Sequence, residues 1–185
     1  MDQALWALGR GAGIAALVLL TLSMASGMVT RSGRPILTLP RFGVVELHKN
    51  TSLLGSLLIV IHVGSLFFDP YAQLNIIDSV VPFLGQYRPF WLGLGTLAVD
   101  LIIVVVATAL LRHRLGHRTF RVVHWSTYAL WPIAFAHALG NGTDVGHAWF
   151  LAIASVCAAL VTAATIFRLR HDFLEFHHSR AGAQR

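Results

Sequence analysis

The chain contains five long apolar stretches separated by shorter, more polar connections. Each stretch is continuously hydrophobic rather than alternating, and each approaches the roughly 20 residues that an α-helix needs to cross a bilayer. Because lipid cannot satisfy backbone hydrogen-bonding groups, a span must be a helix or part of a closed barrel, and unbroken apolar runs favour helices. The pattern predicts membrane-spanning helices at about residues 9–30, 46–68, 91–111, 119–140 and 147–168.

Two apolar segments need separate treatment. Residues 76–84, in the long second connection, are too short to span and contain Pro82, so we expect a short interfacial helix there. The first run, residues 11–30, follows Arg10 and resembles an export signal. It is long for such a signal and Ser23-Met24-Ala25 is a poor cleavage site, so we expect it to remain as a membrane helix.

Composition supports a membrane protein. The 185 residues are 56% hydrophobic and only 12% charged, with a mean hydropathy of +0.67, whereas soluble domains carry roughly 25% charged residues. We therefore predict an all-α, polytopic helix bundle in which residues 1–185 form a single transmembrane domain. Its one cysteine, Cys157, lies in an apolar run, which excludes a disulfide framework, a cysteine zinc motif and C-x-x-C-H haem attachment.

We attribute the net charge of +6 to the orientation of the chain in the membrane and not to nucleic-acid binding, because the basic residues cluster in alternate connections. The first connection has Arg31, Arg34 and Arg41; the third has Arg112, Arg114, Arg118 and Arg121; the tail begins with Arg168 and Arg170. Arg88 is the only basic residue in the second and fourth connections. This alternation predicts five spans in the plasma membrane, with the N-terminus outside and the C-terminus cytoplasmic.

Two of the predicted helices carry a histidine near each end: His48 and His62 on one, His124 and His137 on the other. Both helices run from inside to outside, so His48 and His124 share the cytoplasmic level, and His62 and His137 share the outer level. One imidazole from each helix at each level is what bis-histidine haem ligation requires. At 1.5 Å per residue the levels lie about 20 Å apart, which predicts one haem in each leaflet of a core about 30 Å thick.

The helical phase supports this arrangement directly for the helix that carries His48 and His62. Fourteen residues at about 100° each bring His48 and His62 to one face, but thirteen residues leave His124 and His137 about 140° apart on an ideal helix. Pro132 lies between the latter two and is expected to kink the helix and change their relative direction.

Other roles for these residues remain open at this point. The four histidines can instead be hydrogen-bonded within the bundle, bind a metal ion or relay protons. Asp100 lies mid-span and can accept a hydrogen bond from a ligating histidine, carry a proton, or simply be packed against a hydroxyl. These alternatives define a haem-free ion or proton transporter.

Basic residues near the two levels are candidates for binding haem propionates. Arg88 is the outer candidate, and Arg121 is the inner one, together with Arg41, Lys49 and Arg118. The alternative is that these side chains set orientation or extend to the membrane surface.

The spacings H-x13-H and H-x12-H, on helices two apart, resemble the ferric reductase-like transmembrane domain, a family that includes NADPH oxidases and ferric reductases. The stretches YRPFWLGLGTLAVD and FRVVHWSTYALWPIAFAHALG are also similar to small bacterial members. The resemblance covers residues 46–168, the expected di-haem core. It implies two b-type haems, one bound by His48 and His124, the other by His62 and His137.

The resemblance implies an oxidoreductase component that passes electrons from the cytoplasmic side to an extracytoplasmic acceptor. No G-x-G-x-x-G follows a predicted strand, so we expect a separate flavin-containing reductase, or quinol, as donor. The alternative within the same class is a membrane haem subunit that relays electrons between quinol or a flavoprotein and an extracytoplasmic redox partner.

Overall fold

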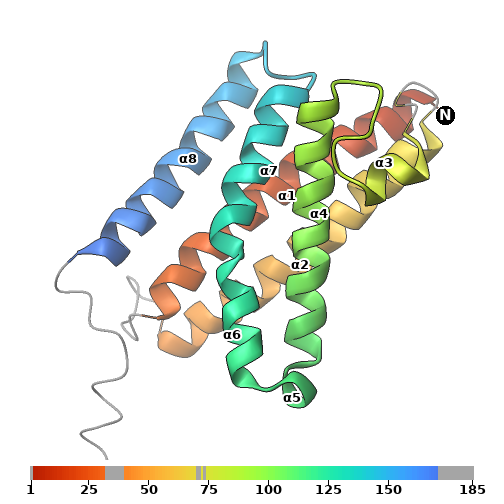
Figure 1. Cartoon of the computed structure of the whole chain (residues 1–185). Helices are drawn as coiled ribbons and strands as arrows, with labels where there is room; N and C mark the ends of the chain where they lie inside the picture. The colour runs from red at the N-terminus through yellow and green to blue at the C-terminus, as the bar shows by residue number, and fades with distance from the viewer. Residues whose placement is uncertain (1, 32–39, 70–71, 73, 171–185) are drawn as a thin grey trace, which may run out of the picture.

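The computed structural model describes residues 2–31, 40–69, 72 and 74–170. These residues form eight α-helices and no β-strand. Four are long and apolar enough to cross a membrane: α1 (Asp2–Thr30), α2 (Arg41–Phe68), α4 (Pro89–Leu110) and α8 (Ala148–Leu169). The shorter helices are α3 (Ile76–Val80), α5 (Arg112–Leu115), α6 (His117–Trp125) and α7 (Thr127–Asn141) (Figure 1).

The all-α membrane architecture predicted from the hydrophobic pattern is confirmed. The first two long helices begin earlier than predicted, at Asp2 and Arg41, and α3 confirms the short helix expected in the second connection. Arg34, one of the charges used to predict orientation, lies outside the described residues. Four candidate spans are found among the described residues. The predicted count of five requires that the segment containing α6 and α7 also crosses the membrane.

The helix predicted over residues 119–140 is interrupted at Ser126, between α6 and α7. The Ser126 hydroxyl donates to the carbonyl of Val123 at 2.7 Å, and the Thr127 hydroxyl donates to that of His124 at 2.7 Å. Such bonds to the preceding turn compete with the helical ladder and bend it. Pro132, where the kink was expected, lies inside α7, so the interruption comes six residues earlier than predicted.

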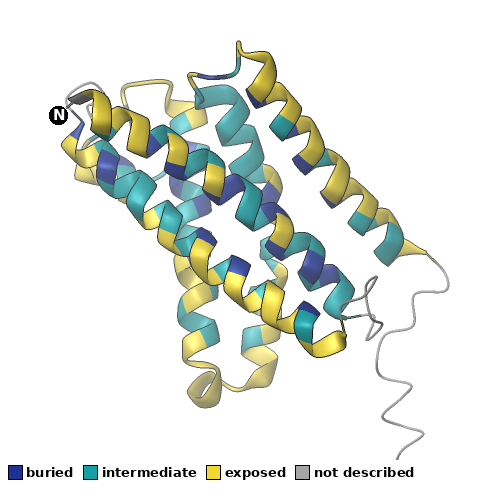
Figure 2. Ribbon diagram, turned by 180° about the vertical axis from the view of Figure 1, so that it is seen from behind, coloured by how far each residue is buried: buried dark blue, intermediate teal, exposed yellow. Residues whose placement is uncertain are grey.

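Helix α1 is the centre of the bundle. It packs against α2, α7 and α8, while α4 packs against α7. Ile59 of α2 packs against the apolar cluster that α4 and α7 share. Seen from behind, the long helices turn exposed positions outward (Figure 2), as expected for surfaces that face lipid.

Two apolar clusters hold these helices together. One joins α1, α7 and α8 through Met28, Trp131, Cys157 and Val161. The other joins α4 and α7 through Ala98, Ile102 and Leu130.

Candidate functional site

The structure brings two of the four predicted histidines into one pair. His48, in the first turns of α2, and His124, near the end of α6, have ring centroids 6.0 Å apart, with the ring planes at 89°. His62 and His137 lie toward the opposite end of the bundle, where Arg10 of α1 is paired with Asp144, just after α7. The predicted pairing of His48 with His124 therefore has a geometric counterpart, and that of His62 with His137 stays a prediction.

The separation of the inner pair suits a shared metal. Metal–imidazole bonds are about 2 Å long and each ring centre lies about 1 Å beyond its ligating nitrogen, so two imidazoles on opposite sides of one metal have centroids about 6 Å apart. The measured distance between the His48 and His124 centroids is 6.0 Å. Two imidazoles leave four positions around an octahedral iron, which is the number that the nitrogens of a haem supply.

Three of the histidines use Nδ1 to bind a backbone carbonyl of a neighbouring helix. His48 Nδ1 lies 2.8 Å from the Ser23 carbonyl, His62 Nδ1 lies 2.7 Å from that of Gly9, and His137 Nδ1 lies 2.8 Å from that of Trp91. A carbonyl only accepts, so Nδ1 carries the proton in each ring and Nε2 has the free lone pair. Metal-ligating histidines usually have this arrangement, which fixes the tautomer and the ring orientation.

Ser23 makes a second contact with His48. Its hydroxyl lies 3.2 Å from His48 Nδ1 and 2.6 Å from the hydroxyl of Ser52. Because Ser52 donates to the His48 carbonyl at 2.6 Å, the Ser23 hydroxyl donates to Ser52 and its oxygen is left to accept from Nδ1–H. This network orients His48 from two sides.

His124 differs from the other three histidines. Its Nδ1 is buried and has no hydrogen-bond partner in the part of the chain that the structure describes. The ring of Phe120 lies beside it, with centroids 5.2 Å apart. Within the described residues, the histidine Nδ1 atoms bond Ser23, Gly9 and Trp91 and not Asp100, the candidate partner of a ligating histidine.

Sequence reasoning missed the contribution of α1. The expected core at 46–168 left this helix out, yet α1 provides two of the three carbonyls, at Gly9 and Ser23. One signal was present: these residues are fourteen apart, the same spacing as His48 and His62. Because α1 and α2 run antiparallel, two residues fourteen apart on α1 can contact two residues fourteen apart on α2, one pair at each level.

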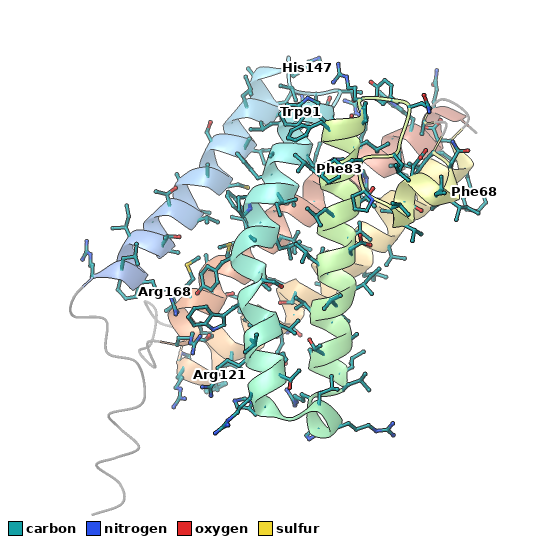
Figure 3. All side chains as sticks on the ribbon, in the orientation of Figure 1. Phe68, Phe83, Trp91, Arg121, His147 and Arg168 are labelled. Carbon is teal, nitrogen blue, oxygen red and sulfur yellow. The ribbon has the colours of Figure 1, made fainter. Side chains whose placement is uncertain are left out.

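The two arginines proposed for propionates lie at opposite ends of the bundle. Arg88, at the N-terminal cap of α4, donates from Nη1 to the Gly140 carbonyl at 2.9 Å, which ties α4 to the end of α7. Arg121 is exposed on α6, three residues before His124. Figure 3 shows Trp91 and His147 at one end of the molecule, and Arg121 and Arg168 toward the other.

The fold and this site define a helical membrane protein that holds histidines near both ends of its spans. The family model described as ferric reductase like transmembrane component matches residues 12–135, which is more than half of the 185 residues. The chain belongs to this family. Neither a search of curated proteins nor a search of solved structures gives a match.

Family membership confirms the resemblance seen in the sequence and indicates a role in membrane electron transfer. Domains of this family generally bind haem. The matched range includes most of α1 and three of the four histidines of the predicted pairs, His48, His62 and His124, and it ends two residues before His137.

Proposed function

We propose that the chain is a b-type di-haem protein that carries electrons across the membrane. His48 and His124 bind the inner haem, and His62 and His137 bind the outer haem. The observation that carries the proposal is the 6.0 Å separation of the His48 and His124 rings, in a chain of the ferric reductase-like family.

The proposed topology has five spans, with α6 and α7 together forming the fourth. Neither helix is long enough alone, but residues 117–141 contain about the number needed to cross a bilayer. Basic residues support a cytoplasmic placement of the His48–His124 end, since Arg121 and Arg168 both lie toward that end (Figure 3). The N-terminus is then extracytoplasmic and the membrane is the plasma membrane.

The chain's residues would do three things for such a cofactor. When bound, haem supplies one-electron redox chemistry at its iron. His48, His62 and His137 offer Nε2, because the Nδ1 of each already bonds a carbonyl, and His124 completes the inner pair. The apolar helices exclude water from the site. Arg88 and Arg121 offer guanidinium donors at the two ends for the propionates.

Electrons are proposed to enter at the cytoplasmic end and to leave at the outer end. The donor is a flavin-containing reductase or quinol, and the acceptor is an extracytoplasmic redox partner or a metal chelate. Support for this direction comes from family membership and from the charge-based orientation.

The test is the haem content of the purified chain, read from oxidised and dithionite-reduced spectra. We expect about two low-spin b-type haems per chain, one for each pair of axial ligands. His48→Ala and His137→Ala should each lose one haem. Matched controls are His113→Ala at the inner end and His147→Ala at the outer end, because both side chains are exposed and outside the proposed pairs.

Two results would contradict the proposal. One is a wild-type chain that contains no haem when produced in haem-supplied cells, which would favour the ion-binding alternative. The other is a full haem complement in His48→Ala or His137→Ala.

A further inference from the structure

Three histidines make the same two contacts with a neighbouring helix, one with a backbone carbonyl and one with a glycine. The Nδ1 of His62 bonds the carbonyl of Gly9, and the ring lies over Gly13. His48 repeats this with Ser23 and Gly27, and His137 repeats it with Trp91 and Gly95. In each case the accepting carbonyl belongs to residue n and the glycine is residue n+4.

Helix geometry explains the spacing of four. The carbonyl of residue n already accepts the N–H of residue n+4 and has a second lone pair available. A helical side chain points back over the turn N-terminal to its own Cα, so a side chain at n+4 covers the carbonyl of residue n. Glycine at n+4 leaves that carbonyl open to a second donor from another helix.

The rings occupy the space that a side chain would need. A Cβ added to Gly95 would lie 2.5 Å from Cε1 and 2.6 Å from Nδ1 of His137. At Gly13 the nearest atoms of His62 would be Nδ1 at 2.9 Å and Cε1 at 3.0 Å. At Gly27 the nearest atoms of His48 are again Cε1, at 3.0 Å, and Nδ1, at 3.1 Å. The same two ring atoms face the glycine each time, so the three rings approach in the same way.

We propose that Gly13, Gly27 and Gly95 are positioning residues that hold His62, His48 and His137 by exposing a carbonyl for Nδ1–H. The inference rests on the proposed function, in which these histidines are axial ligands. The bond fixes the Nδ1–H tautomer and raises the basicity of Nε2, as partners of metal-bound histidines do.

The arrangement is unequal between the two levels. Both outer histidines, His62 and His137, have a carbonyl and a glycine, whereas at the inner level only His48 does. His124 Nδ1 has no partner within the described residues. Among the described residues, His124 is therefore oriented by packing against Phe120, whereas a backbone carbonyl orients each of the other three.

The glycines are tested by adding the methyl group that the structure excludes. Gly13→Ala and Gly95→Ala should affect the outer haem, and Gly27→Ala the inner one. Loss of such a partner weakens metal binding roughly 10- to 100-fold, so we expect lower haem retention during dilution. Where haem is retained, the midpoint potential of the affected haem should rise, because a less basic imidazole stabilises ferric iron less.

The chain offers matched controls. Gly11 lies two residues from Gly13 on α1, and Gly64 lies two residues from His62 on α2. A Cβ at either position meets nothing within 4 Å. Gly11→Ala and Gly64→Ala should therefore retain both haems at unchanged potentials.

The outcomes separate this inference from the proposed function. A wild-type chain without haem contradicts the proposed function. A wild-type chain with two haems, together with retention and potentials in Gly13→Ala, Gly27→Ala and Gly95→Ala equal to those of Gly11→Ala, contradicts the role of the glycines alone.

A measurement on the unmodified protein covers the case in which an alanine variant does not fold. Redox-difference infrared spectra of protein labelled with 15N at histidine Nδ1 report the hydrogen bonding of that atom in each ligand. We expect a strongly hydrogen-bonded class and a weakly bonded one, with the weak band lost in His124→Ala. A single, weakly bonded class would contradict the inference.

Discussion

The hydroxyl of Thr21 serves two hydrogen bonds in the middle of the bundle. It donates to the carbonyl of Leu17 at 2.8 Å and accepts the indole N–H of Trp131 at 2.9 Å. Both Thr21 and Trp131 are buried. Without the Thr21 oxygen, the indole N–H would therefore be a buried donor with no water to bond. The contact joins α1 to α7, between the levels of the two histidine pairs.

Replacing Thr21 by valine keeps the shape and removes the acceptor. An unsatisfied buried donor costs about 1–3 kcal/mol, so Thr21→Val should unfold at a lower temperature in detergent than wild type. Thr108→Val is the control, because the Thr108 hydroxyl bonds only carbonyls of its own helix. Equal melting temperatures for the two variants would show that the Trp131 contact contributes nothing to stability.

At the scale of elements, the interruption between α6 and α7 falls between His124 and His137. A continuous helix would place His124 and His137 about 140° apart. In the structure His124 lies beside His48 of α2, and the Nδ1 of His137 bonds the carbonyl of Trp91 on α4. The hydroxyls of Ser126 and Thr127 favour the interruption. Pro132, which lacks an N–H, removes one further helical hydrogen bond inside α7.

Restoring a continuous helix should separate the ligands. In the triple variant Ser126→Ala, Thr127→Ala, Pro132→Ala, all three changes favour helix, and we expect the haem content to fall from about two per chain toward one as the phase reverts. Thr108→Ala is the matched control, since it removes the same kind of hydroxyl-to-carbonyl bonds on α4. Unchanged haem content in the triple variant would mean that the hydroxyls and the proline do not set the direction of these histidines.

An ion pair between α1 and the connection after α7 also fixes the position of α1 along its own axis. Arg10 Nε donates to Asp144 Oδ2 at 2.8 Å, its Nη2 pairs with Oδ1, and its guanidinium lies 3.8 Å from the Trp6 ring centroid. Asp144 is buried, and two parallel bonds give geometric specificity. This pair is adjacent to Gly9, so it sets the level at which the Gly9 carbonyl meets His62.

For the whole molecule, the arrangement of helices keeps the site between two packed pairs. Helix α2 packs on α1, and α4 packs on α7. Between the two histidine levels, Ile59 of α2 packs against the cluster that α4 and α7 share. A flat macrocycle is proposed to bind on either side of this contact, between the paired imidazoles of each level.

The proposed orientation is tested with single cysteines. Cys157 is buried, so a Cys157→Ala background removes the one native thiol. Gln86→Cys, in the exposed connection before α4, should react with an impermeant maleimide in intact cells, whereas Arg114→Cys, on the exposed α5, should react only after the membrane is opened. The reverse pattern of labelling would invert the proposed topology, and labelling of both in intact cells would exclude an odd number of spans between them.

The sequence by itself determined the membrane class, the long helices and the family. Continuous apolar runs of spanning length allow only helices in lipid, and the two histidine spacings carry the resemblance that the family match confirmed. The sequence also predicted that His48 and His124 lie at one depth, because parallel helices bring equivalent positions together, and their ring centroids are 6.0 Å apart.

Only the tertiary structure decided what holds the histidines. The interruption at Ser126 depends on side-chain bonds within one turn, which hydropathy does not register. Gly13, Gly27 and Gly95 look like ordinary helix glycines until a ring from another helix is placed over them. An accepting carbonyl is present in every residue, so which carbonyl receives Nδ1–H follows from how α1, α2, α4 and α7 pack, not from residue type.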